Sequence, residues 1–142
     1  MKARFGWWHC RNVTREHIER ALKIVPVVSV QNRYSFADRE WDYVVDYCEK
    51  HGIAFIPWFP LGAGKLAGEV LNEIARARQV SPNQVALAWL LRRSTVMLPI
   101  PGTSSVEHLE QNVAAASLQL SQEEYDRLAE GRSCSHRDSV RQ

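Results

Sequence analysis

Residues 98–112, LPIPGTSSVEHLEQN, join an apolar segment to a charged helical pattern through a glycine and three hydroxyl side chains. Gly102 allows the backbone to turn closely. Thr103, Ser104 and Ser105 offer hydroxyls beside the free N–H groups of the helix that begins there. Hydroxyls and free N–H groups at the positive end of a helix suit a bound phosphate. A helix that is merely capped by these serines is the alternative interpretation.

Amide and aromatic side chains stand at the ends of two other apolar stretches. Gln31 ends VVSVQ, residues 27–31, and Trp58 lies in PWFPLG, residues 57–62. A side-chain amide at the carboxyl end of a parallel strand lies where ligands usually bind, and an indole ring offers a flat surface for stacking. A solvated glutamine and a tryptophan packed in the core are the alternatives.

The apolar pattern along the chain predicts a framework of strands and helices that would position these residues. Short apolar or β-branched runs predict strands over residues 27–31, 53–60 and 96–100. Apolar residues at helical spacing predict helices over residues 14–24, 38–52, 68–80, 81–93, 104–116 and 121–131. This order is typical of an α/β protein with a parallel sheet.

Several predicted helices carry their own start and stop residues. Ser81, Pro82 and Gln84 form the sequence pattern of a capping box, and Ser-x-x-Glu recurs at residues 104–107 and 121–124. Thr14 and Asp38 are each expected to cap the start of a helix. Gly52 and Gly131 are each expected to follow the end of one. These residues predict where the helices begin and end.

Composition excludes several classes of protein. The 142 residues are 45% apolar and 24% charged, which is typical of a globular domain. A formal charge of +2 does not indicate a nucleic-acid-binding surface, and Cys10, Cys48 and Cys134 lack C-x-x-C spacing. No apolar run approaches about 18 residues, and the start lacks a signal-peptide pattern. We expect a soluble cytoplasmic protein with reduced thiols, no metal, and no nucleic-acid or membrane partner.

Three predicted strands are too few for a complete parallel domain. A closed (β/α)₈ barrel needs about 250 residues. A Rossmann half is poorly supported because no G-x-G-x-x-G follows a predicted strand. The chain is therefore interpreted as part of a larger α/β architecture.

Four segments resemble successive landmarks of the aldo-keto reductase family in the same order and spacing. They are VVSVQNRYS, GIAFIPWFPLGAG, VSPNQVALAWLLRR and LPIPGTSSVEHLEQN, which together extend over roughly residues 13–130. The resemblance implies a partial (β/α)₈ TIM barrel, its C-terminal half with strands six to eight and their outer helices. It also implies NADPH as cofactor and reduction of aldehydes and ketones. IPGTSSVEHL and the aromatic pair before PLG are similar to the branch that contains pyridoxal reductases.

The resemblance implies a nicotinamide end of the cofactor site. Gln31 would pair with the nicotinamide carboxamide, Trp58 would stack on the nicotinamide ring, and Asn12 would match an amide-binding asparagine. The loop that would pass over the pyrophosphate carries Phe59, Leu61 and Gly62.

The resemblance also implies a phosphate end. The loop of Gly102, Thr103, Ser104 and Ser105 would hold the adenosine 2′-phosphate and ribose, with His108 beside it. Gln111 and Asn112 match the positions that hydrogen-bond the adenine. The chain would therefore carry cofactor-binding residues from both ends of NADPH.

Three positions depart from the family pattern. Many relatives have Lys where Gly102 stands and Arg where His108 stands, so two permanent positive charges that favour NADPH over NADH are absent. Arg11 stands where the family has a serine beside the residue that matches Asn12. Lys65, in GAGKLAG, could approach the pyrophosphate, although a surface lysine is the simpler interpretation.

The family's catalytic residues, an Asp, a Tyr, a Lys and a His, come from the first half of the barrel. None of the histidines and tyrosines considered for these roles matches such a position: His9, His17, His51, Tyr34, Tyr43 and Tyr47. We therefore expect no catalytic residue here and no carbonyl reduction by this chain alone, because the carbonyl oxygen would receive no proton.

The expected organisation has three parts. Residues 1–12 are atypical, residues 13–131 form the C-terminal half of the reductase domain, and residues 132–142 are a polar tail. A start inside a longer gene, or a frame error over residues 1–11, would explain the atypical beginning. Two kinds of function stay open: part of an NADPH-dependent reductase, or a non-catalytic nucleotide-binding remnant or auxiliary subunit. An unstable translated fragment is a third interpretation. Uncovered apolar strands also predict either self-association, or precipitation and binding of hydrophobic dyes.

Overall fold

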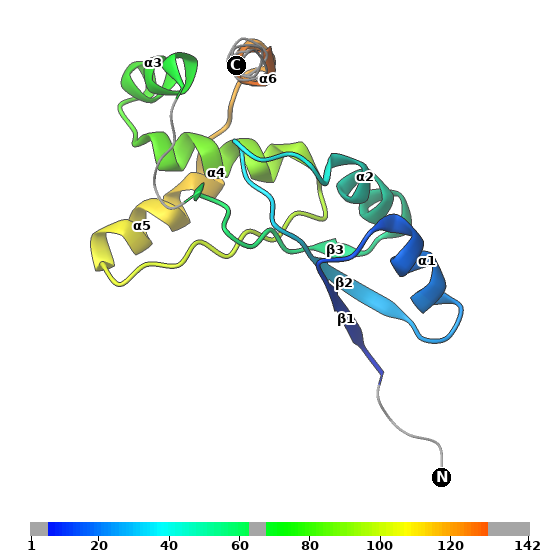
Figure 1. Cartoon of the computed structure of the whole chain (residues 1–142). Coiled ribbons are helices and arrows are strands. Elements are labelled where there is room, and N and C mark those ends of the chain that lie inside the picture. The colour runs from blue at the N-terminus through cyan, green and yellow to red at the C-terminus, as the bar shows by residue number, and fades with distance from the viewer. Residues whose placement is uncertain (1–5, 63–67, 131–142) are drawn as a thin grey trace, which may run out of the picture.

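The computed structural model describes residues 6–62 and 68–130. Lys65, Gly131, Cys134 and the predicted tail lie outside the described residues. In chain order (Figure 1) the elements are β1 (Trp8–Arg11), α1 (Arg15–Leu22), β2 (Val27–Gln31), α2 (Asp42–His51), β3 (Ala54–Phe55), α3 (Glu69–Arg78), α4 (Pro82–Arg93), α5 (Val106–Ala114), the 3-10 turn η2 (Ala115–Ser117) and α6 (Gln122–Glu130).

The sheet is parallel, as predicted, with strand order β1-β2-β3. Arg11 of β1 stands opposite Gln31 of β2, and Val30 of β2 stands opposite Phe55 of β3. A parallel bridge between Phe55 and Met97 adds one more segment beyond β3. Because all of these pairings are parallel, the carboxyl ends of the paired segments lie along one edge of the sheet.

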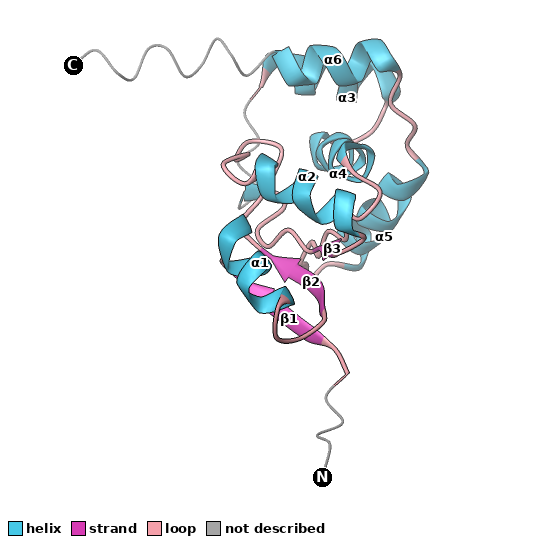
Figure 2. Ribbon diagram, turned by 90° about the vertical axis from the view of Figure 1, so that its right-hand side faces the viewer, coloured by secondary structure: helices cyan, strands magenta, loops and turns pink. Residues whose placement is uncertain are grey.

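Helices cover one face of β1 and β2 and leave the other face open (Figure 1, Figure 2). The helix α1 packs on β2 and α2 packs on β3, with Ile18 and Val30 fully buried between the layers. The uncovered face carries His9, Ser29 and Gln31, which contact one another through hydrogen bonds. A polar cluster on an open sheet face is accessible to a ligand.

The helix α4 is the centre of the core. Val85–Leu90 are all buried, as expected for a helix that is apolar on every side. Trp89 packs edge-on against Phe36 and stacks on Tyr125, with the Arg39 guanidinium 3.9 Å from the indole centroid. Beyond α4, the helices α3 and α6 lie on the side away from the sheet (Figure 2). No helix in the described ranges combines the length and hydropathy needed to cross a membrane.

Several predicted boundaries are confirmed. The strand β2 spans the predicted residues, and Thr14 caps α1 by accepting the backbone N–H of His17. Gly52 ends α2 in the left-handed conformation, at φ 63°. Capping boxes begin α4 at Ser81 and α6 at Ser121. Each of these ends depends on residues within one helical turn, which explains why the local sequence predicted them.

The strand predicted over 53–60 is shorter in the structure. Only Ala54–Phe55 form β3. Pro57 and Pro60 have no N–H to donate, so a regular ladder cannot continue through them. The Trp58 backbone N–H still donates to a carbonyl of the neighbouring segment, so the chain continues alongside β2 toward the open edge.

The strand predicted over 96–100 is reduced to the single bridge at Met97. Around this bridge the Phe55 N–H donates to the Val96 carbonyl and the Leu98 N–H donates to the Phe55 carbonyl, each at 2.8 Å. Pro99 and Pro101 interrupt the pattern after that. The strand β1 was not predicted, because its exposed His9 and Arg11 do not give the apolar run of a buried strand.

The caps predicted at Asp38 and Ser104 are wrong. Asp38 does not cap α2, which begins at Asp42 after Trp41. Instead, Asp38 closes a turn with Ser35 through reciprocal backbone hydrogen bonds, and its carboxylate pairs with Arg33 at 3.1 Å. This turn fixes the backbone before the helix, so the capping position moves several residues along the chain.

The helix α5 begins one residue later than the pattern Ser104 to Glu107 predicts. Ser105 is the cap, and its hydroxyl accepts the backbone N–H of His108 at 3.4 Å. The hydroxyl of Thr103 accepts the backbone N–H of Ser105 at 3.1 Å, which places Ser104 in the turn before the helix.

The capping geometry predicts the effect of removing one hydroxyl. Replacing Ser81 by Ala should lower the free energy of unfolding by about 1 kcal/mol, because the Gln84 N–H loses its acceptor at the start of the core helix. Urea unfolding followed by circular dichroism measures this loss. Ser104→Ala is the matched control and should change stability by less than about 0.5 kcal/mol. Equal losses for the two variants would contradict the assigned caps.

Candidate functional site

The open edge of the sheet brings Asn12, Gln31 and Trp58 together. Asn12 follows β1 with φ 52°, and its backbone N–H donates to the Gln31 carbonyl at 2.9 Å. Its side-chain Oδ1 accepts the indole N–H of Trp58, also at 2.9 Å. The hydrogen bond fixes the Trp58 ring relative to the ends of β1 and β2. Three predicted site residues therefore form one cluster.

The side chain of Gln31 is held by its neighbours on the uncovered face. His9 lies between Ser29 Oγ, 3.0 Å from its Nδ1, and Gln31 Oε1, 3.3 Å from its Nε2. Because Oε1 is an acceptor, the His9 Nε2–H is the donor in the second contact. The side-chain carbonyl of Gln31 is thereby engaged. The side-chain N–H groups of Gln31 remain available to donate to the carbonyl oxygen of a ligand.

A groove of about 510 Å³ begins at Phe59, the residue after Trp58. Its walls come from the loop after β3, the first turn of α4 and the segment that leads into α5. The lining residues are Phe59, Pro60, Leu61, Gly62, Asn83, Ile100, Pro101, Gly102 and His108. The groove therefore unites the predicted pyrophosphate loop with two residues of the predicted phosphate end.

A tight turn shapes one wall of this groove. The Gly62 N–H donates to the Phe59 carbonyl at 3.1 Å, and both residues have positive φ, 57° for Gly62 and 63° for Phe59. Leu61 lies between them, and the Arg33 guanidinium is 5.5 Å from the Phe59 ring centroid. The turn presents backbone rather than long side chains to the groove at Gly62.

The first turns of α4 and α5 border the groove from the other side. Asn83 is the second helical residue of α4, and His108 is the third helical residue of α5. Free N–H groups and the positive ends of helix dipoles favour negatively charged groups. The groove can therefore accept an anion between the two helices.

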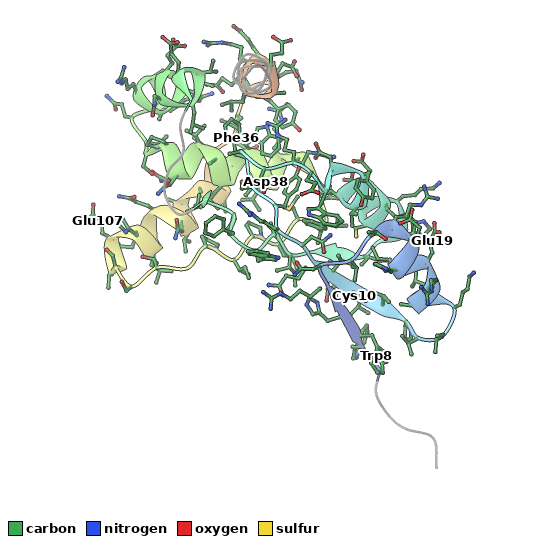
Figure 3. The ribbon with its side chains drawn as sticks, in the orientation of Figure 1. Trp8, Cys10, Glu19, Phe36, Asp38 and Glu107 are labelled. Carbon is green, nitrogen blue, oxygen red and sulfur yellow. The ribbon has the colours of Figure 1, made fainter. Side chains whose placement is uncertain are left out.

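The structure does not bring every predicted phosphate-end residue into this groove. Asn112 lines a different, apolar groove of about 490 Å³ beside Leu98 and Val113. Gln111 donates to the Glu107 carboxylate at 3.3 Å. Figure 3 shows Glu107, in the first turn of α5, far from Cys10 on β1. A ligand that contacts both ends of the candidate site must therefore be extended.

The three predicted hydroxyls have different surroundings. Ser105 is the half-buried cap of α5, whereas Thr103 and Ser104 are exposed. The Thr103 hydroxyl is engaged by the backbone of Ser105. The capped-helix interpretation thus accounts for two hydroxyls, and Gly102 is the loop residue that lines the groove.

Sequence reasoning missed two residues of the site. Arg11 lies at the end of β1 beside Trp58, and Asn83 lines the groove from α4. The sequence pattern marks Arg11 only as a departure beside Asn12, because it does not predict β1. Asn83 sits directly after Ser81 and Pro82, so its position in a first helical turn was the available signal.

None of the excluded tyrosines and histidines lines the groove, and His9 contacts Gln31 on the uncovered sheet face. Tyr34 is fully buried and donates a hydrogen bond to the Asp42 carboxylate. Burial, reinforced by that hydrogen bond, raises the pKa of Tyr34. His17 completes the α1 capping box, and His51 stacks on Tyr47 with ring centroids 4.2 Å apart. These side chains therefore have structural contacts.

The described residues offer neither a metal cluster nor a reactive thiol. In residues 6–62 and 68–130, no group of three or more His, Cys, Asp and Glu side chains could hold a metal ion. Burial raises the pKa of the Cys10 thiol and raises that of Cys48 to about 12. Both thiols therefore stay protonated near neutral pH and are weak nucleophiles.

The parallel sheet, its one helical layer and the groove beside the strand ends define part of a β/α fold with a candidate ligand site at one edge. A thermostable aldo-keto reductase solved with the inhibitor epalrestat superposes with a TM-score of 0.77 and 33% identity, over 83% of this chain and 45% of that one. The aldo/keto reductase of Klebsiella pneumoniae, solved with NADP and acetate, gives a TM-score of 0.75 and 30% identity, over 85% and 46%.

Residues 7–132 match the Aldo/keto reductase family, to which this chain belongs. It is 51% identical over 120 residues to an uncharacterized oxidoreductase of Schizosaccharomyces pombe, covering 83% of this chain and 39% of that protein. It is 48% identical over 113 residues to pyridoxine 4-dehydrogenase of Escherichia coli, covering 79% and 40%. The chain thus spans about two fifths of these curated relatives and has the fold of part of their barrel.

The bond between Asn12 and Trp58 predicts a stability effect. Asn12→Ala should lower the free energy of unfolding by about 2 kcal/mol, because it removes a hydrogen bond and leaves Ala in a left-handed conformation. Asn12→Asp keeps the acceptor and tolerates that conformation, so it should stay within about 0.5 kcal/mol of the parent. Urea unfolding followed by tryptophan emission measures both. An Asp variant as unstable as the Ala variant would refute this assignment.

Proposed function

We propose that the chain carries the NADP(H)-binding part of an aldo-keto reductase that reduces aldehydes or ketones. One observation carries the proposal: Trp58 of the Asn12, Gln31 and Trp58 cluster lies beside Phe59, with ring centroids 6.3 Å apart, and Phe59 lines the groove that reaches Gly102 and His108. A flat ring fits the first part and an anion fits the second. A non-catalytic nucleotide-binding role would use the same residues.

At the nicotinamide end, the proposed contacts follow from the hydrogen-bond groups present. The amide N–H groups of Gln31 would donate to the carboxamide oxygen, while His9 holds its carbonyl. Trp58 would support one face of the nicotinamide ring, because the bond from its indole N–H to Asn12 lies at the edge of the indole and leaves the faces of the indole free of that bond. When bound, NADPH supplies the hydride for carbonyl reduction. These residues bind and orient the ring rather than transfer a proton.

At the phosphate end, the described lining residues include no Lys or Arg. Phosphate groups would instead meet the backbone near Gly62 and Gly102, the amide of Asn83 and the imidazole of His108. Ser104, Thr103 and Ser105 would contact the ribose and 2′-phosphate from the loop before α5. The resulting preference for NADPH over NADH would be weaker than a permanent charge gives.

Gln111 and Asn112 are proposed for the adenine, at the far end from Gln31. Both are half-buried on α5 and carry amides that can donate and accept hydrogen bonds. Gln111 would exchange its bond to Glu107 for one to the base. The extended course from Gln31 to Asn112 suits a dinucleotide.

The named relatives support this assignment. One solved neighbour is a reductase complex with NADP and acetate, and another, at 27% identity, is a complex with NADPH. The pyridoxine 4-dehydrogenase relative favours a pyridoxine-like alcohol or its aldehyde as the substrate class. Because this chain spans about two fifths of that relative, catalysis is proposed for the completed barrel.

Cofactor binding by the 142-residue protein is directly testable. NADPH should quench tryptophan fluorescence in the parent, and Trp58→Ala should remove most of the quenching because the stacking ring is lost. Trp8→Phe is the matched control, since Trp8 is exposed on β1, away from the groove, and its replacement should leave the Kd unchanged. Unaltered quenching in Trp58→Ala would refute the stacking assignment, and no quenching in the parent would refute the proposed function.

The open sheet also supports a proposal about assembly. Beyond Met97, the exposed side chains of Leu98, Ile100, Leu109 and Val113 surround the apolar groove, each more than half exposed. The outer edge of β1 is the other unpaired edge among the described strands. Exposed apolar surface beside unpaired strand edges favours pairing with another chain. We expect a second copy of this chain to cover these surfaces.

Sedimentation velocity at micromolar concentration tests this assembly. The 142-residue protein should sediment as a dimer or larger species, and Leu109→Lys should weaken the association by placing a charge beside the apolar groove. Leu22→Lys is the matched control, because Leu22 is a partly exposed leucine on α1, on the other side of the molecule. A sharp monomer with cooperative thermal unfolding and little binding of hydrophobic dyes would exclude self-association.

A further inference from the structure

Arg11 lies within the residues proposed for the nicotinamide end. It is the last residue of β1 and stands opposite Gln31 in the parallel register. Its guanidinium carbon is 5.7 Å from the ring centroid of Trp58, and the next residue is Asn12, which accepts the Trp58 indole N–H. The guanidinium is therefore placed beside the indole on which the nicotinamide ring would stack.

The charge of Arg11 is not neutralised by a neighbouring carboxylate. In residues 6–62 and 68–130, no acidic side chain forms an ion pair with Arg11, whose contact is the Trp58 ring. Other arginines are paired, as Arg78 is with Glu124 at 2.7 Å. An arginine is always charged in proteins, so a full positive charge acts at the face of this ring.

We propose that Arg11 makes this site select the neutral, reduced nicotinamide over its positively charged, oxidised form. The inference rests on the proposed function. A pyridinium ring stacked on Trp58 would bring its positive charge close to the guanidinium and would be repelled by it. A dihydropyridine ring carries no charge and meets no such repulsion. The predicted result is tighter binding of NADPH and earlier release of NADP⁺, which suits a carbonyl reductase.

Isothermal titration of the 142-residue protein with NADPH and NADP⁺ tests this proposal. The ratio of the NADP⁺ Kd to the NADPH Kd should fall about fivefold in Arg11→Gln, the effect of removing one unit charge at short range in a partly solvated site. Arg11→Lys keeps the charge and should retain most of the ratio. Arg11→Met is a second uncharged variant of similar length and should match Arg11→Gln. Circular dichroism checks that each variant is folded.

The ligand 2′,5′-ADP, which lacks nicotinamide, separates this effect from general attraction of phosphates. Its Kd should be the same in the parent and all three variants. An unchanged NADP⁺ to NADPH ratio in Arg11→Gln and Arg11→Met, with both ligands still bound, would overturn the role of Arg11 and leave the proposed function standing. Parallel weakening of all three ligands would also overturn it, because Arg11 would then act on phosphates. Absence of binding to the parent would overturn both proposals.

Discussion

The parallel pairing of β2 with both neighbours is the constraint on which the candidate site depends. In a parallel sheet the carboxyl ends of adjacent strands lie at the same edge, so residues that follow different strands become neighbours. The register that sets Arg11 opposite Gln31 also delivers Asn12 to the backbone carbonyl of Gln31. A shift of one residue would turn these side chains to the helical face. The register therefore determines which residues can meet a ligand.

The core helix α4 connects this edge to the groove. Its buried apolar residues pack on every side, and Trp89 is enclosed by Phe36 and Tyr125. Because the helix is fixed by this packing, its first turn holds Asn83 at the groove wall. The same packing leaves the positive end of the helix directed at a surface that several loops share. The core packing and the groove wall thus depend on one helix in different turns.

The incomplete covering of the sheet and of α5 has two consequences that belong together. It makes the polar cluster of His9, Ser29 and Gln31 accessible, and it leaves apolar side chains beyond Met97 without a covering layer. In a closed barrel the first surface faces the interior and no strand edge remains. The match to relatives of which this chain spans about two fifths fits both features. Binding groups and association surfaces therefore arise from the same open architecture.

The sequence by itself determined the α/β class, the strand β2, the caps at Thr14 and Ser81, and the residues that mark the family, since these depend on local patterns. Only the tertiary structure decided that Asn12 bonds Trp58, 46 residues away, and that Asn83 shares a groove with His108. The shortened strands and the displaced caps also needed it. Proline interruptions and competing turns act through partners distant in sequence, which local propensity does not contain.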